Sequence, residues 1–158
     1  MTAAGRETAR MLVPPPLLYL LVLTAGYFLN RRWPLRLFPR QTPAVVLAGL
    51  ALVLVGGGLA LWAVLAFRRA GTSPNPLAPA RALAADGPYR FTRNPMYLGL
   101  GVAALGVAVA FNALWPFLLV PAAMLLSVPL AIVREERYLE KRFGEPYRDY
   151  KGRVRRWL

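Results

Sequence analysis

Two carboxylates come just after the longest uncharged run of the sequence, and they are the clearest candidates for a role in binding or catalysis. Glu135 and Glu136 come just after the apolar segment that ends at Val133. On a helix, neither has a basic neighbour three or four positions away, so an intrahelical salt bridge does not account for them. They are either exposed to water or need a positive partner from elsewhere, because an unpaired carboxylate at membrane depth is costly. Arg90, Arg93 or a cationic ligand could be that partner.

A second segment that could take part in binding or catalysis is residues 87–97, with the sequence Gly-Pro-Tyr-Arg-Phe-Thr-Arg-Asn-Pro-Met-Tyr. Pro95 suits the first turn of a helix and Asn94 suits its cap, so the free N–H groups at this helix start could hold a carboxylate. Gly99 and Gly101 follow one turn later and would admit either a flat ligand or a neighbouring helix. The competing interpretation is a capped helix start whose Arg side chains and aromatic rings lie among lipid headgroups.

Aromatic residues near the C-terminus allow two interpretations. Phe143, Tyr147 and Tyr150 precede a basic tail that ends in Arg153, Arg155, Arg156 and Trp157. We expect these aromatics to anchor a helix at the headgroups, since tyrosines are enriched there. A lid over a bound cofactor is the alternative.

The absence of two residue types narrows the chemistry. The chain contains no Cys and no His, which removes disulfides, thiolate nucleophiles, Ser-His-Asp triads and the usual zinc and haem ligands. We therefore expect no metal site. The net charge is +13, but the basic residues lie between apolar runs and do not form one soluble face, so no nucleic-acid partner is expected.

Hydrophobic runs predict an all-α, polytopic membrane protein with about four transmembrane helices. Residues 11–29 and 44–67 are each long enough to cross the hydrocarbon core. Residues 96–133 would form a helix about twice as long as that core is thick, so this run must fold back as a hairpin. The turn is expected at residues 112–116, with a bend of the second helix at Pro121 or Pro129.

The basic residues predict the orientation. Most of them lie at the two ends of the chain and in the segment that follows residue 67, which places both termini in the cytoplasm. Four arginines between the first two helices are discordant, and the loop that carries them is expected to lie in the membrane interface. We expect an N-terminal helical pair at residues 1–69 and a catalytic region at 70–158. The latter contains a Pro- and Gly-rich loop at 71–94 and a cytoplasmic amphipathic helix that begins at Arg134 and is interrupted at Gly144 and Pro146.

Two long motifs carry a resemblance to a known superfamily. Residues 87–99, Gly-Pro-Tyr-Arg-x-x-Arg-Asn-Pro-Met-Tyr-Leu-Gly, and residues 135–150, Glu-Glu-x-x-Leu-x-x-x-Phe-Gly-x-x-Tyr-x-x-Tyr, resemble the isoprenylcysteine carboxyl methyltransferase and phospholipid methyltransferase superfamily. The similarity extends over roughly residues 70–158. It implies a membrane-embedded enzyme that transfers a methyl group from S-adenosylmethionine, leaving S-adenosylhomocysteine, to a lipophilic or small acceptor that enters from the membrane lipids.

The resemblance also implies site residues. Those that match cofactor contacts are Arg81, Ala82, Leu83, Ala84, Tyr89, Asn94, Pro95, Met96, Tyr97, Gly99, Gly101, Glu135 and Glu136. Glu136 is also a candidate catalytic residue, together with three arginines that could orient the acceptor, Arg90, Arg93 and Arg134.

The sequence departs from carboxyl-methylating relatives at two positions. Asn94 stands where many of them have His, and Ile132 stands where they place a substrate-binding Arg. A prenylcysteine carboxylate is therefore not implied as the acceptor. A phospholipid N-methyltransferase, an NADPH-dependent enzyme related to sterol reductases and a non-enzymatic membrane scaffold are the alternatives.

Overall fold

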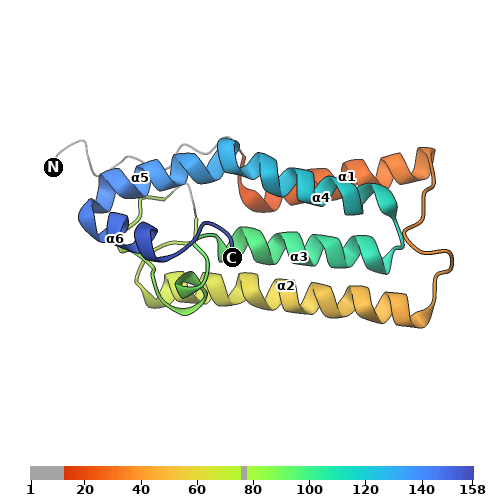
Figure 1. The fold of residues 1–158 in the computed structure, drawn as a ribbon, viewed down its shortest axis with the longest axis horizontal. Coiled ribbons are helices and arrows are strands. Elements are labelled where there is room, and N and C mark those ends of the chain that lie inside the picture. The colour runs from red at the N-terminus through yellow and green to blue at the C-terminus, as the bar shows by residue number, and fades with distance from the viewer. Residues whose placement is uncertain (1–12, 76–77) are drawn as a thin grey trace.

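Four helices run up and down in one bundle, and two shorter helices lie at one end of it (Figure 1). The computed structural model describes residues 13–75 and 78–158. The bundle helices are α1 (Pro15–Arg32), α2 (Pro43–Arg69), α3 (Pro95–Ala110) and α4 (Leu114–Ser127). The chain then continues through the π-helical segment η3 (Val128–Ile132), α5 (Val133–Phe143) and α6 (Glu145–Arg153). The prediction of an all-α protein is confirmed.

Proline sets the start of three bundle helices. Pro15, Pro43 and Pro95 each occupy the first helical position, where a missing N–H costs no hydrogen bond. The loop between α2 and α3 contains one 3₁₀ turn, η2 (Gly87–Arg90), and otherwise runs as turns and irregular chain. This agrees with the expectation for residues 71–94, of which 76 and 77 lie outside the described residues.

Glycines bring α2 and α3 into backbone contact. A Cβ atom at Gly99 would lie 2.6 Å from Ala60 N and from Gly56 O, and a Cβ atom at Gly106 would lie 2.6 Å from Gly49 O. No such separation is tolerated between real atoms, so only glycine fits at these positions. The two helices therefore pack along their length, as Figure 1 also shows.

The turn between α3 and α4 spans residues 111–113, at the start of the predicted region, and Asn112 adopts a φ of 51° there. Its side chain accepts a hydrogen bond from Phe38 N (2.8 Å) and donates one to Phe38 O (3.0 Å). Trp115 Nε1 donates to Trp33 O at 2.8 Å. These bonds fasten the loop between α1 and α2 to the hairpin turn.

Asn112→Ala is expected to lower the free energy of unfolding by about 2 kcal/mol, because two hydrogen bonds are lost and alanine tolerates a positive φ poorly. Asn30→Ala, which removes only a 3.3 Å bond at an exposed site, should cost less than about 0.5 kcal/mol. Thermal unfolding of both variants in detergent measures the difference. Equal midpoints would contradict the role given to Asn112.

One long helix runs from Leu114 to Phe143, and the π-helical segment interrupts it where Pro129 lies. A proline lacks the N–H that a regular turn requires, which accounts for the interruption at this position. Pro121, the other predicted bend, lies inside regular α4. The chain beyond Val133 turns polar, and the predicted break at Gly144 is present, with a φ of 62° between α5 and α6.

Two helices are long and apolar enough to cross a membrane, Pro43–Arg69 and Leu114–Phe143, whereas the apolar α3 is shorter. Leu47, Leu54, Val55 and Leu61 of α2 are exposed, as expected for side chains that face lipid. The membrane character of the prediction is thus supported by length and composition. Four spans, cytoplasmic termini and the division at residue 69 remain predictions, and the N-terminal Arg6 and Arg10 lie outside the described residues.

Candidate active site

A cavity of about 210 Å³ lies at the end of the bundle where α3 begins and α5 leaves it. Its lining comes from the start of α1, the end of α2, the loop that follows α2 together with η2, the start of α3, the end of η3, and helices α5 and α6. The two sequence motifs therefore converge. Asn94, Met96 and Tyr97 from the first motif and Glu135 and Glu136 from the second line the same cavity.

Glu136 is buried, with 6% of its surface exposed, and is held by two arginines. Its Oε1 accepts a hydrogen bond from Arg156 Nε at 3.0 Å, and its Oε2 accepts one from Arg156 Nη2 at 2.8 Å. Arg93 Nη1 lies 3.1 Å from the same Oε1 as an ion pair. The expected partnership with Arg93 is present. The Glu136 carboxylate raises the pKa of Arg156, chiefly by accepting its hydrogen bonds.

Glu135 differs from its neighbour. It lines the cavity and is half-buried, and within the described part of the chain it takes part in no ion pair. Arg93 offers a second unused group, since its buried Nε has no hydrogen-bond partner among the described residues. The cavity lining thus contains one carboxylate and one guanidinium group, which could serve a ligand with both a cationic and an anionic group.

Asn94 precedes α3 as predicted, but its side chain does not cap the helix. Its Nδ2 instead donates a hydrogen bond to Arg156 O at 2.9 Å. The side chain thus bonds to the C-terminal tail and, among the described residues, to no N–H of the first turn of α3. The capping expectation was wrong, although the position at the helix start was right.

The loop before η2 forms one wall. Ala82, Leu83 and Ala84 line the cavity, as the resemblance implies. Two side chains of α5 hold this wall: Tyr138 Oη accepts a hydrogen bond from Ala80 N at 2.9 Å, and Arg142 Nε donates one to Ala80 O at 3.2 Å.

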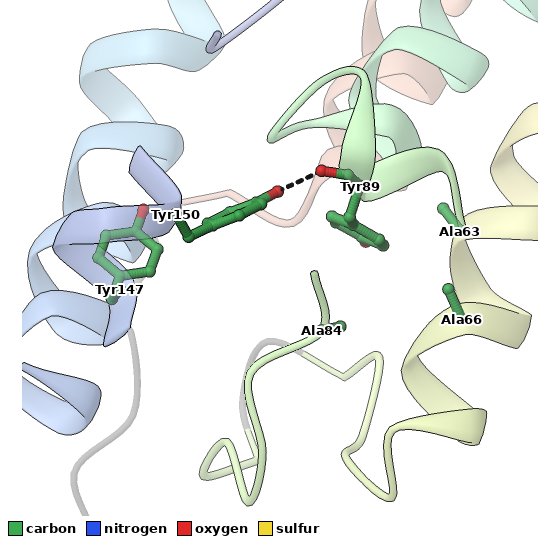
Figure 2. Packing of buried hydrophobic residues seen from close by; sticks show 6 residues of the cluster. All are labelled: Ala63, Ala66, Ala84, Tyr89, Tyr147 and Tyr150. Atoms are coloured by element: carbon green, nitrogen blue, oxygen red, sulfur yellow. Dashed lines mark hydrogen bonds between the residues drawn. The ribbon is translucent and has the colours of Figure 1, made fainter. Parts of the chain in front are cut away.

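Tyr89, Tyr147 and Tyr150 line the cavity, and they belong to one buried cluster with alanines of α2 and of the loop before η2 (Figure 2). Tyr150 Oη donates a hydrogen bond to Tyr89 O at 2.8 Å, and the Tyr89 ring packs edge-on to Phe67 at 5.1 Å between centroids. Tyr147 and Tyr150 are 2% and 5% exposed, so the expectation that they anchor a helix at lipid headgroups was wrong. Burial raises the pKa of all three phenols, which therefore remain protonated at neutral pH.

Several predicted residues lie outside the cavity lining. Arg81, Arg90 and Arg134 are exposed, and Pro95 is buried at the start of α3. Gly99 faces α2, and a Cβ atom at Gly101 would lie 3.2 Å from Tyr19 Oη and 2.8 Å from Met124 Sδ. For both glycines the geometry favours helix packing, the alternative to cofactor contact. Of the three candidate arginines, only Arg93 reaches the cavity.

Other lining residues carried no functional signal in the sequence. They are mostly apolar residues of helices or loops, together with Tyr138 on α5: Pro14, Pro15, Pro16, Phe67, Ala78, Ala80 and Tyr138. Arg156 was grouped with the basic tail, and only the fold reveals that it pairs with Glu136. An acid pair without basic neighbours on its own helix was the available hint of such a partner.

Comparisons with known proteins identify the family of the chain. Residues 44–146, well over half of the chain, match the phospholipid methyltransferase family. A stretch of 63 residues, 40% of the chain, is 41% identical to a protein of Haemophilus influenzae described as an uncharacterized protein, and covers 79% of that protein. No solved structure matches the chain significantly.

The family match implies a methyltransferase, and two helices of the described structure could cross a membrane. The chain belongs to the phospholipid methyltransferase family, within the superfamily that also includes the isoprenylcysteine carboxyl methyltransferases. Methyltransferases of this family use S-adenosylmethionine.

Proposed function

We propose that this protein is an integral membrane enzyme that transfers a methyl group from S-adenosylmethionine to a lipid acceptor. The observation that carries the proposal is the convergence of both family motifs on one cavity, with Asn94 and Tyr97 on one side and Glu135 on another. Family membership supports the methyl donor, and the apolar helices beside the cavity support a lipophilic acceptor.

The residues present fit the proposed cofactor. The Glu135 carboxylate, which forms no ion pair among the described residues, suits its ammonium group, and the Arg93 guanidinium group suits its carboxylate. Leu83, Tyr89 and Tyr150 offer apolar surface for its nucleoside. Bound there, S-adenosylmethionine would supply an electrophilic methyl group on a positively charged sulfur.

The protein's own contribution is proposed to be alignment and exclusion of water. Displacement at a methyl group needs no strong acid or base when the acceptor is already nucleophilic, and holding the reactants in line can supply much of the rate enhancement. The buried tyrosines and the loop wall at residues 80–84 shield the cavity from bulk water. Of the three arginines considered for orienting the acceptor, only Arg93 lines the cavity, whereas Arg90 and Arg134 are exposed.

Binding and turnover test the proposal together. Titration calorimetry with purified protein is expected to show micromolar affinity for S-adenosylhomocysteine and none for NADPH. Membranes that contain the protein, incubated with methyl-labelled S-adenosylmethionine, should transfer label to the lipid fraction, and control membranes should not. Binding of NADPH alone would instead favour the reductase alternative, and binding of neither would favour a scaffold.

A further inference from the structure

The last residues of the chain lie against the start of α3. Arg155 O accepts a hydrogen bond from Arg93 N at 2.9 Å. Arg156 O accepts two more, from Thr92 Oγ1 at 3.1 Å and from Asn94 Nδ2 at 2.9 Å. Trp157 packs against the cluster of Tyr97, Ala131 and Ile132. The C-terminus accordingly lies beside the first turn of α3 in Figure 1.

The Arg156 side chain extends this attachment to α5. It binds both oxygens of Glu136, and Arg93 adds the second cation, so that one buried carboxylate is held between two guanidinium groups. We call Arg93, Glu136 and Arg156 the clamp. Its members come from the loop before α3, from α5 and from the tail, and the reversal at Gly144 brings the tail back to α5.

The clamp weakens the attraction between Glu136 and a cationic ligand. Two positive charges lie within 3.1 Å of its oxygens, so the local charge is already more than neutralised. A further cation gains little there, because the two guanidinium groups repel it at the distance at which the carboxylate attracts it. Glu135, one residue earlier, has no such partner in the described part of the chain.

We infer that the two glutamates have separate roles: Glu136 and Arg156 are positioning residues that hold α5 and the C-terminal tail against the start of α3, and Glu135 is the carboxylate that contacts the cationic ligand. This inference rests on the proposed function of the cavity. It gives the C-terminal tail a part in the site, although Arg156 does not line the cavity.

The test measures S-adenosylhomocysteine affinity and the thermal midpoint of four variants in detergent: Arg156→Gln, Arg156→Lys, Glu136→Gln and the double variant Glu136→Gln/Arg156→Gln. Arg156→Gln is expected to weaken binding about tenfold and to lower the thermal midpoint by several degrees, because the charge-assisted hydrogen bonds that hold Glu136 and the tail in place are lost. Arg156→Lys should recover part of both, since it keeps the charge but lacks the two-pronged geometry. Arg155→Gln is the matched control, because its side chain is exposed and its carbonyl is unchanged.

The double variant separates positioning from direct contact. Because Glu136 and Arg156 act through each other, the double variant should bind hardly more weakly than the poorer single variant. The inference is overturned if Arg156→Gln binds like wild type, or if Glu136→Gln abolishes binding while Arg156→Gln and the thermal midpoint are unaffected. Wild-type protein that binds no S-adenosylhomocysteine would instead overturn the proposed function. In that case the thermal midpoints still test the clamp, because a shift in the double variant equal to the sum of the two single shifts would show that Glu136 and Arg156 do not act through each other.

Discussion

Glu135→Gln is expected to weaken S-adenosylhomocysteine binding by about 100-fold, while the thermal midpoint stays at or slightly above the wild-type value. Hydrogen bonds to charged groups contribute up to about 3 kcal/mol, and every 1.4 kcal/mol corresponds to about tenfold in affinity. The protein itself loses no ion pair among the described residues, because Glu135 has none there. Removing a half-buried charge that has no ion-pair partner among the described residues is neutral or favourable for folding.

Glu140→Gln is the control for this prediction, since it removes a carboxylate from the same helix. Glu140 pairs with Arg148 and Lys151 near the surface and does not line the cavity. Exposed ion pairs contribute about 1 kcal/mol or less, so binding should not change and stability should change little. Calorimetric titration measures the affinity of both variants for S-adenosylhomocysteine. An unchanged affinity of Glu135→Gln would contradict the proposed contact between this carboxylate and the ligand.

The second large effect concerns the helix pair that carries the site. Gly56→Leu is expected to prevent α2 and α3 from packing, because a side chain at residue 56 would overlap the backbone at Gly99 and Ala103. Overpacking of a closely packed contact commonly costs about 1–3 kcal/mol, and overlap with backbone on two sides places this substitution at or beyond the upper end. We expect low yield, early thermal unfolding and loss of cofactor binding.

Gly57→Leu provides a matched comparison one residue away. A Cβ atom at Gly57 meets nothing within 4 Å, so the same substitution there should be tolerated in detergent and in membranes. Size-exclusion chromatography and thermal unfolding of the pair would measure the contrast. Similar behaviour of the two variants would contradict the described contact between α2 and α3.

Sequence patterns predicted those parts of the fold that local chemistry determines. Proline at the first helical position marks the start of α3, and the polar interruption near Asn112 marks the hairpin turn. Length and apolar character predicted about four spans, and two helices among the described residues are long and apolar enough to cross a membrane. The break at Gly144 followed from a glycine and a proline placed close together after a charged helix.

Contacts between distant segments were predicted less well, because the spacing of residues in the sequence does not determine which partner a side chain contacts. Asn94 was placed correctly at the start of α3, yet its amide bonds to Arg156 O, which comes from a tail 62 positions away. Gly99 was compatible with a ligand or with a helix, and only the position of α2 decides for the helix. The partner of Glu136 was correctly sought outside its own helix, but Arg156 became a candidate only once α6 had reversed the chain.

The central claim is that the two motif segments form one cofactor site, and hydrogen–deuterium exchange with and without S-adenosylhomocysteine tests it most directly. Added ligand is expected to slow exchange in both residues 80–98 and residues 134–140, which line the cavity or adjoin it. The loop at residues 33–42, at the opposite end of the bundle in Figure 1, should exchange at the same rate in both states. Protection confined to one motif segment, or protection of neither, would contradict the shared site.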